Sequence, residues 1–422
     1  MNDFILKGTI CYSIGPRKLA VYENSYAICV DGVSRGVFGE IPPEYAHLPV
    51  QDHGEALIVP GMVDLHIHAP QYTFRGTGMD LELMDWLQQQ AFPEEASFQN
   101  GAYAEKAYSI FAEQLKRSAT TRAVVFGTRH GGATELLMEK LEQTGLVTFV
   151  GKVNMDQNAP EPLVEKSPEA SAADTLAWLE HTTDRFERTK PVLTPRFIPS
   201  CSRPLLEKLG EIRRERKLPV QSHLSENPGE IAFVKELFPE QPTYGHCYDH
   251  YGLLGEDTIM AHCVYSAPEE VALLKEKGVF VAHCPASNTN LASGIAPIRR
   301  YLDSGLRVGL GSDVAGGHSE SMFRAITDAI QVSKLYWRLV DENSKPLTFV
   351  EAFYLATMGG GAFFGKVGSF APGYAFDALV LSEKDMLRWS DLNPRQRLEQ
   401  YAYLEKGSHS LQAKFVAGRR IF

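Results

Sequence analysis

The stretch Ile58-Val-Pro-Gly-Met-Val-Asp64-Leu-His66-Ile-His68 decides the fold, because it sets two imidazoles in an apolar run that has the composition of a buried strand. Side chains two residues apart on a strand point the same way, so His66 and His68 share one face. Imidazole is a common metal ligand, and two imidazoles on rigid backbone can bind one cation and leave positions open for water. A His-x-His pair also fits packed core histidines, so a metal site needs further ligands.

The bulk composition describes an ordinary globular chain with a small-molecule partner. It has 422 residues, of which 44% are hydrophobic and 22% charged. The formal net charge of -10 argues against a nucleic-acid-binding surface. Six cysteines without a CxxC pair favour a reducing compartment. With no signal sequence and no apolar run of about 18 residues, we expect a cytoplasmic protein that does not bind a membrane.

β-rich runs alternate with helical patterns through the middle of the chain. After the opening strand at 58–66, these runs occupy residues 122–126, 146–150, 192–197, 218–223, 258–262, 279–283 and 307–313. Eight strands separated by helices, including 102–118 and 268–277, predict an α/β fold of the (β/α)8 TIM-barrel type. A doubly wound sheet is the alternative, but no GxGxxG motif follows the first strand.

Short apolar pieces bounded by Gly, Pro and Asp occur at both ends of the chain. They include Phe4-Ile-Leu, Ala27-Ile-Cys-Val30, Phe376-Asp-Ala-Leu-Val-Leu381 and the run 414–422. This rhythm is typical of small antiparallel strands. We therefore expect a small β-sandwich domain made of residues 1–57 and 366–422, with a distorted catalytic barrel at 58–365.

Polar residues stand at the carboxyl ends of the predicted barrel strands, where functional residues of such barrels lie. They are His66 and His68 on strand one, His223 on strand five, His262 on strand six, His283 on strand seven and Asp313 on strand eight. Buried polar groups need each other or a metal. Three of the histidines with Asp313 suit zinc or another divalent transition metal (His66, His68, His223). Such a metal lowers the pKa of a bound water from 15.7 toward about 7, so hydrolysis or deamination is implied.

Linked motifs carry a family resemblance over nearly the whole chain. The pattern from Pro60-Gly61 through His66-x-His68, with His223, His262 and Ser312-Asp313 in order, resembles the amidohydrolase superfamily. Within it, the chain is most similar to the guanine deaminases through Asp64-Leu-His-Ile-His-Ala-Pro-Gln71-Tyr, Thr194-Pro-Arg196-Phe197, Gln221-Ser-His223-Leu-Ser-Glu226-Asn, Ala282-His-Cys-Pro-Ala-Ser-Asn288 and Gly311-Ser-Asp313-Val-Ala-Gly-Gly. Five linked motifs in order are highly specific.

The resemblance implies hydrolytic deamination of guanine to xanthine and ammonia by a metal-activated water, as part of purine catabolism. It implies one divalent metal, zinc in the first place with Fe²⁺ as the alternative, held by His66, His68, His223 and Asp313. Asp313 would also accept a proton from the attacking water, and His262 would orient or polarise that water. Glu226 would carry a proton to the ring nitrogen, a task that a raised pKa favours.

The resemblance also assigns substrate contacts. Gln71 would bind a purine edge, Arg196 would donate to the guanine O6 atom, and Phe197 would form an aromatic wall. His68, His223, Glu226 and Asp313 would also touch the substrate. Without the resemblance, we would interpret Arg196 as an ordinary salt-bridge residue and Phe197 as a core residue. Superfamily members with two metals carry a modified lysine where Arg196 and Phe197 stand, so one metal is favoured, and similar proteins are often homodimers.

Two alternatives stay open. Another mononuclear aminohydrolase or dechlorinase could act on a pterin, a triazine or a different purine. A non-catalytic barrel scaffold is the alternative outside the enzymes, but such proteins typically lose ligands, and here none of the expected ligands is missing.

Overall fold

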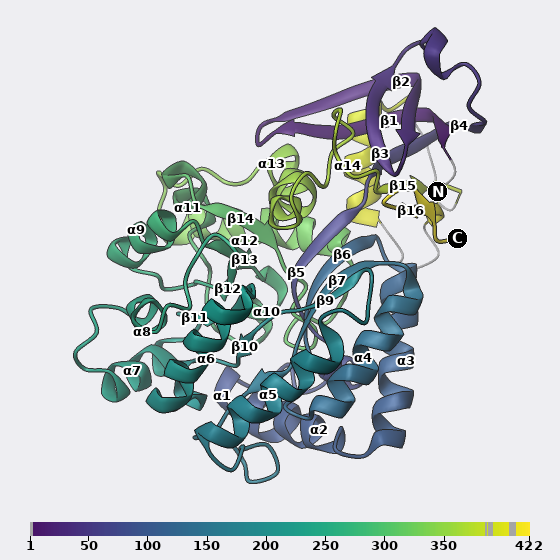
Figure 1. Cartoon of the computed structure of the whole chain (residues 1–422). Coiled ribbons are helices and arrows are strands. Elements are labelled where there is room, and N and C mark those ends of the chain that lie inside the picture. Colours follow the sequence, from purple (N-terminus) through teal and green to yellow (C-terminus); the bar gives the residue numbers. More distant parts are fainter. Residues whose placement is uncertain (1–2, 385, 387–390, 405–410) are drawn as a thin grey trace.

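The two ends of the chain meet in one β-sheet, and the middle of the chain winds through alternating strands and helices (Figure 1). The structure is a computed structural model that describes residues 3–384, 386, 391–404 and 411–422. No helix within those residues is both long enough and apolar enough to cross a membrane.

Strands from both chain ends form the terminal sheet. They are β1 (Phe4–Gly15), β2 (Lys18–Val30), β3 (Val33–Phe38), β4 (Val50–Pro60), β15 (Ala378–Leu381), β16 (Leu411–Val416) and β17 (Arg419–Arg420). The strand order is β17-β16-β15-β4-β1-β2-β3, and the antiparallel pairing of β15 with β4 joins the two ends. The prediction that strands from both termini pair is confirmed, and the strands form one sheet. The domain limits at 57/58 and 365/366 stay a prediction.

Parallel strands form the second part of the molecule. One sheet contains β5 (Met62–His68), β6 (Thr120–Phe126), β7 (Val147–Gly151) and β9 (Thr189–Pro191), and another contains β11 (Val220–Leu224), β12 (Thr258–His262), β13 (Phe280–His283) and β14 (Arg307–Leu310). A bridge from Leu193 to Val220 connects the sheets on one side. On the other side the Asp313 N–H donates to the His66 carbonyl at 2.8 Å. The strands therefore follow one another around a ring, as the (β/α)8 prediction requires.

Helices follow most of these strands. They are α1 (Leu83–Trp86), α2 (Phe92–Ser97), α3 (Gly101–Arg117), α4 (Gly131–Thr144), α5 (Pro168–Thr182), α6 (Arg203–Arg216), α7 (Pro228–Leu237), α8 (Tyr244–His250), α9 (Pro268–Lys277), α10 (Pro285–Asn290), α11 (Ile298–Ser304), α12 (Met322–Leu339), α13 (Phe349–Tyr354) and α14 (Pro394–Leu404). The prediction of a helix at 268–277 is confirmed by α9. Proline at its first position and the left-handed Gly278 just after it set these limits.

Three strand predictions are wrong in their limits. Residues 58–60 end β4 of the terminal sheet instead of opening the first barrel strand. The strand expected at 192–197 is interrupted, with β9 before it and the two-residue β10 (Thr194–Pro195), paired with β8 (Val153–Asn154), inside it. Pro191 and Pro195 have no N–H to donate to a ladder, which accounts for the interruption. Finally, β14 ends at Leu310, so Asp313 lies in the loop beyond the strand.

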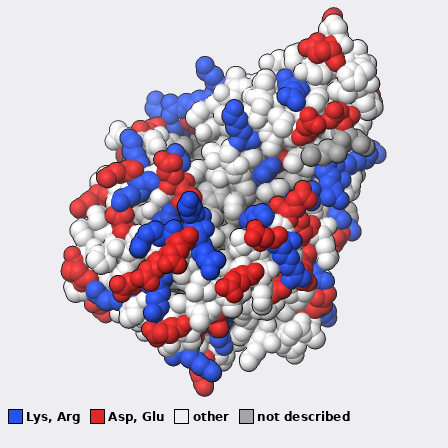
Figure 2. Space-filling view, viewed as in Figure 1, with Lys and Arg blue, Asp and Glu red and all other residues white. Residues whose placement is uncertain are grey.

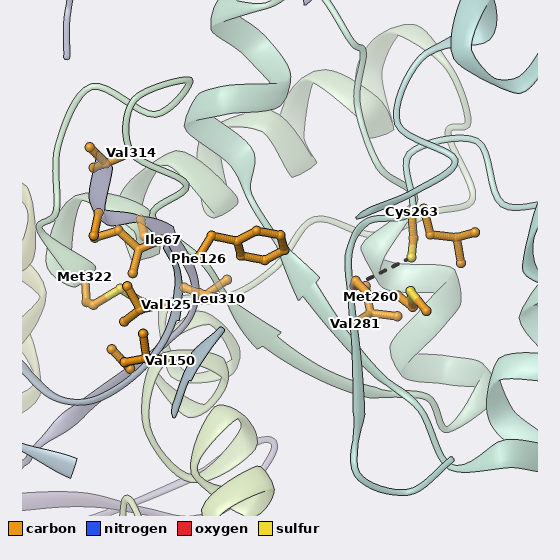
Figure 3. Close-up of a cluster of buried hydrophobic side chains, with 14 of the residues drawn as sticks. Ile67, Val125, Phe126, Val150, Met260, Cys263, Val281, Leu310, Val314 and Met322 are labelled. Carbon is orange, nitrogen blue, oxygen red and sulfur yellow. Dashed lines mark hydrogen bonds between the residues drawn. The ribbon is translucent and has the colours of Figure 1, made fainter. Parts of the chain in front are cut away.

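Apolar side chains pack against the barrel strands close to their carboxyl ends (Figure 3). Ile67 of β5, Phe126 of β6, Val281 of β13 and Leu310 of β14 are all fully buried. Close-packed interiors tolerate little displacement, so this core holds the strand ends in fixed positions. Over the face in Figure 2, cationic and anionic side chains are interspersed.

Candidate active site

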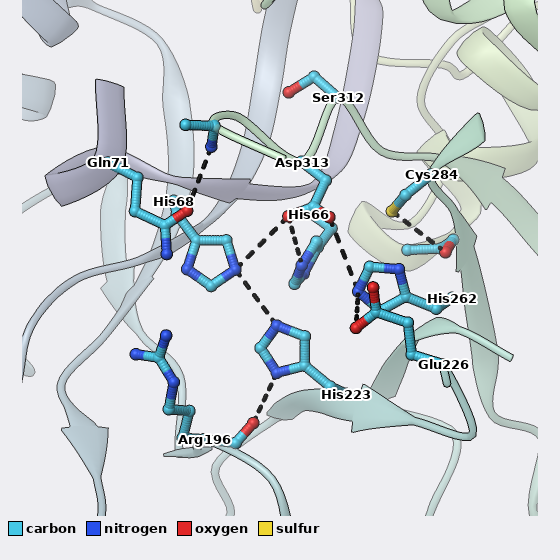
Figure 4. Close-up of polar contacts among 12 residues, drawn as sticks. His66, His68, Gln71, Arg196, His223, Glu226, His262, Cys284, Ser312 and Asp313 are labelled. Carbon is cyan, nitrogen blue, oxygen red and sulfur yellow. Dashed lines mark hydrogen bonds and ion pairs between the residues drawn. The ribbon is translucent and has the colours of Figure 1, made fainter. Parts of the chain in front are cut away.

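Residues from several barrel strand ends line one pocket (Figure 4). Its lining residues are His68, Gln71, Leu83, Trp86, Leu87, Arg196, Phe197, His223, Glu226, Glu230, His262, Ser287, Leu291, Asp313 and Gly316. All the predicted substrate contacts are among them. His66 is not, because it is fully buried behind the pocket wall. Gln71 and Arg196 lie on one side of the histidines, and Glu226 and His262 lie on the other.

The predicted metal ligands converge at one point. Nε2 of His66 lies 3.1 Å from Oδ1 of Asp313, and Nε2 of His68 lies 3.5 Å from the same oxygen. Nε2 of His68 is also 3.2 Å from Nε2 of His223. Nδ1 of His66 is buried and has no hydrogen-bond partner among the residues described, and Nδ1 of His68 is in the same state. Buried nitrogens aimed at a shared point with a carboxylate fit a divalent metal.

Cys284 offers a second donor set, together with His66 and Asp313. Burial raises the pKa of its thiol well above the usual range, with nearby carboxylates adding to the effect. Only the thiolate is a good metal ligand. The three histidines with Asp313 are therefore the better set.

The protonation states suit metal binding as well. Burial lowers the pKa of His68 and of His223 well below the usual value, and neighbouring histidines lower it further. Burial alone would raise the pKa of Asp313, but His66 and His262 hold it far below its usual range. Neutral imidazoles and an ionised carboxylate are the forms that bind a metal.

One aromatic ring packs against the three histidines. The centroid of Phe126, at the end of β6, lies 4.9 Å from that of His66, 4.5 Å from His68 and 4.9 Å from His223. This apolar contact restricts how far each imidazole can rotate. The sequence placed Phe126 only within a strand, because nothing local distinguishes it from a core residue.

Hydrogen bonds outside the cluster fix the ligands from behind. Nδ1 of His223 lies 2.6 Å from the Arg196 carbonyl, which turns Nε2 toward the other ligands. Asp64 accepts from the Ser312 hydroxyl at 2.5 Å, from the Ser312 N–H at 3.0 Å and from the His66 N–H at 3.1 Å. Asp64 thus ties β5 to the loop that carries Asp313. The sequence contained Asp64 in a motif without indicating this role.

A group suited to proton transfer stands beside the cluster. Oε2 of Glu226 lies 3.4 Å from Nε2 of His262, and that nitrogen lies 3.7 Å from Oδ2 of Asp313. Burial raises the pKa of Glu226. Burial lowers the pKa of His262, but Glu226 and Asp313 outweigh it, so the pKa is raised. Nδ1 of His262 lies 2.9 Å from the side-chain oxygen of Asn288, which orients the ring.

Backbone strain accompanies this arrangement. His262 and Asp313 have φ angles of 72° and 48°, and Ser225 has 49°, values that residues with a Cβ seldom adopt. Each of the three stands at or just beyond the carboxyl end of its strand. Such strain persists where the surrounding structure imposes it, and it is concentrated at functional sites.

Other residues near the site were missed by the sequence. Glu95 of α2 hydrogen-bonds both Gln71 and Arg196 from behind the pocket. Ser293 donates to Glu226, and Glu230 accepts from the Glu226 N–H at 3.0 Å. No local pattern marks Glu95 or Ser293, because each is recognisable only by a partner distant in the sequence, whereas Glu230 closes a capping box with Asn227 at the start of α7. His283 is buried and both its ring nitrogens lack a partner among the described residues.

The comparisons with known proteins agree on one family. The model of the amidohydrolase family matches residues 57–415. A guanine deaminase from Dictyostelium discoideum is 37% identical over 401 residues, covering 89% of this chain and 88% of that protein. The human guanine deaminase is 40% identical over 331 residues, covering 77% and 72%. A crystal structure of guanine deaminase from C. acetobutylicum with guanine bound in its active site superposes with a TM-score of 0.96, at 43% identity and full coverage of both chains.

Proposed function

Because the chain belongs to the amidohydrolase family, we propose that it hydrolyses guanine to xanthine and ammonia in the pocket described above. One observation carries the proposal. The same pocket is lined by the ligand candidates His68, His223 and Asp313, by the acid-base group Glu226 and by the purine-binding candidates Gln71 and Arg196, with His66 buried behind its wall. Relatives that carry the name guanine deaminase and align over most of their length support the same activity.

We propose that His66, His68, His223 and Asp313 hold one divalent metal, with zinc as the first candidate. Nitrogen donors with one carboxylate suit zinc, and Fe²⁺ accepts the same ligands. When bound, the metal would lower the pKa of a water molecule and so supply a nucleophile at neutral pH.

Asp313 and Glu226 divide the proton transfers of the reaction. Water adds to C2 of guanine while Asp313 accepts a proton, and the electrons of the C2–N3 double bond move to N3, which takes a proton from Glu226. The amino group then accepts the proton held by Asp313, the bond from C2 to that nitrogen breaks, and ammonia leaves. The remaining hydroxyl loses its proton to Glu226 as C2 becomes a carbonyl carbon. The raised pKa of Glu226 favours the protonated form that begins this cycle.

The rest of the pocket would hold the flat ring. Gln71 and Arg196 provide hydrogen-bond donors to the purine edge, and Phe197 provides an aromatic wall. Leu83, Trp86 and Leu87 add an apolar surface from the segment before α2. A pocket with an apolar wall and a few fixed polar groups is typical of small-molecule sites.

The direct test is turnover of guanine by zinc-loaded protein, with xanthine and ammonia measured together. The proposal predicts both products in equal amounts. Glu226→Gln should bind zinc normally and lose turnover, which separates proton transfer from metal binding. A pterin, a triazine and a second purine should be poorer substrates. If one of them is converted and guanine is not, the specificity is wrong, and if none is converted by zinc-loaded protein, the enzyme proposal fails.

We also propose that the protein is a cytoplasmic homodimer that acts in guanine degradation. Exposed apolar side chains at the end of α12 support a contact between copies, with Leu335 49% exposed and Leu339 73%. Analytical ultracentrifugation tests the dimer, because it compares the mass in solution with the 46.9 kDa of one chain. A monomer at all concentrations would contradict it.

A further inference from the structure

We propose that Glu95 is a positioning residue that orients Gln71 and Arg196 and so makes the pocket select an exocyclic oxo group over an amino group at the same position of the ring. The inference rests on the proposed function, because it concerns the substrate edge of the same site. Glu95 lies on α2, is 1% exposed, and is not among the residues that line the pocket. It therefore acts through its two neighbours rather than by touching a ligand.

The carboxylate of Glu95 divides its two oxygens between the two neighbours. Oε1 accepts from Nε2 of Gln71 at 2.8 Å, and Oε2 accepts from Nη1 of Arg196 at 2.5 Å. Both partners are buried, with Gln71 2% exposed and Arg196 4%. A charge-assisted hydrogen bond is stronger and geometrically more specific than a neutral one. One buried side chain thus sets two pocket residues that are 125 positions apart in the sequence.

Glu95 also fixes which end of the Gln71 amide carries hydrogen. The Ala315 N–H donates to Oε1 of Gln71 at 3.2 Å, so that end must be the acceptor. The carboxylate of Glu95 requires a donor at the other end. With both ends specified, the amide cannot flip without losing both bonds. The second hydrogen on Nε2 remains for a ligand.

Arg196 depends on the same carboxylate. A buried guanidinium without a partner is strongly unfavourable, and Glu95 supplies the opposite charge. The bond uses only one of the five N–H groups of Arg196, so others stay available to a ligand. The ring of Phe92, also on α2, lies 5.1 Å from the guanidinium carbon and packs against it. Arg196 is therefore held in place on two sides by one short helix.

The result is a pocket edge that presents N–H donors from both Gln71 and Arg196. An oxo group on the ring can accept from such donors. An amino group at the same place is itself a donor, which would leave buried donors unpaired and is strongly disfavoured. Guanine and 2,6-diaminopurine form the matched pair, because they differ in having an oxo or an amino group at C6 and, as a consequence, in whether N1 carries a hydrogen.

Glu95→Gln tests the inference with almost no change of shape. A neutral amide offers one acceptor and one donor, whereas Gln71 and Arg196 both present donors, so one of the two bonds must fail. We expect kcat/KM for guanine to fall about 100-fold through misplacement of the ring, and for 2,6-diaminopurine to change little or rise. Glu94→Gln is the control, since Glu94 is on the same helix but bonds Thr73 and Tyr103 instead. It should keep both activities.

A double variant distinguishes positioning from general damage. If Glu95 acts through Arg196, adding Glu95→Gln to Arg196→Met should cost far less than in the wild type, because the partner charge is already gone. Unchanged guanine preference in Glu95→Gln, or an equal loss for both purines, would overturn the inference.

If the wild type converts neither purine, the proposed function fails, and the inference is then tested by ligand-induced shifts in Tm. Guanine should stabilise the wild type more than 2,6-diaminopurine, and Glu95→Gln should abolish the difference. The same difference in both proteins would overturn the inference.

Discussion

The hydroxyl of Ser293 donates to Oε1 of Glu226 across 2.9 Å, although the two residues are 67 positions apart in the chain. Both side chains are buried, and the other oxygen of Glu226 faces His262. Ser293 therefore holds one oxygen of the carboxyl and leaves Oε2 to carry the mobile proton. This contact sets the direction in which Glu226 can deliver it.

Ser293→Ala should lower kcat for guanine about 10-fold while KM changes little, because it removes an orienting hydrogen bond of about 1–1.5 kcal/mol from the proton carrier. Steady-state kinetics measure both constants. Ser304→Ala is the control, since that hydroxyl bonds the Tyr301 carbonyl at the end of α11, which leads into the amino end of β14. A rise in KM with normal kcat would show that Ser293 serves binding instead.

Gly311→Ala should destabilise the protein by about 1–3 kcal/mol and weaken metal binding. A Cβ there would lie 2.9 Å from both Cβ of His66 and Sγ of Cys284, so β5 and the loop after β14 would have to separate. Chemical denaturation and zinc titration measure the two effects. Gly132→Ala in α4 is the matched control, because nothing lies near its added Cβ and alanine favours a helix. Equal stability of the two variants would contradict the close approach.

The sequence predicted those parts of the site that carry local signals. His66 and His68 are marked by strand alternation, and Asp313 ends the predicted strand at 307–313, so their convergence was expected from the order of the strands. The helix at 268–277 was predicted well because Pro268 and Gly278 mark its ends. Such features depend on neighbours within a few residues.

The remaining parts depend on contacts between distant segments. Glu95, Ser293 and Phe126 have no distinctive neighbours in the chain, and their roles follow only from the side chains they meet in space. The strand expected at 192–197 was misjudged because its β-rich composition outweighed the missing N–H groups of Pro191 and Pro195. Propensity alone does not determine how a proline is accommodated in a barrel.

The free energy of unfolding should fall at low pH in part because Glu351 becomes protonated. Burial raises the pKa of this carboxyl, but hydrogen bonds from Arg299, Thr348 and Arg17 outweigh it and lower the pKa from 4.5 to about 2. A folded pKa below the unfolded value stabilises the protein above pH 4.5, and this contribution is lost as the pH falls toward 2. At neutral pH it is worth roughly 2–3 kcal/mol.

Glu351→Gln should therefore unfold more easily than the wild type at pH 7, and the difference should shrink steadily as the pH falls below 4.5. Urea denaturation at a series of pH values measures it. Arg17 belongs to the turn between β1 and β2, so the contact also joins the terminal sheet to the barrel. A difference that does not depend on pH would assign the effect to packing.

Chelation of the metal should destabilise the wild type, and this effect can be measured without an activity assay. A ligand that binds only the folded state adds about 4 kcal/mol of stability when its free concentration is about 1,000 times its Kd. Removing zinc should therefore lower Tm in the wild type and leave His68→Ala unaffected, because that variant lacks a ligand. Scanning calorimetry with and without chelator makes the comparison. Equal responses of the two proteins would place the metal elsewhere.

Hydrolysis of guanine at C2 is tested most directly by turnover in water enriched in oxygen-18, with the product analysed by mass spectrometry. The account predicts xanthine that carries one oxygen-18 atom, at C2, with one ammonia released per xanthine, and no such product from Glu226→Gln. Recovery of unreacted guanine, without labelled xanthine, after incubation with folded, zinc-loaded protein would contradict the account.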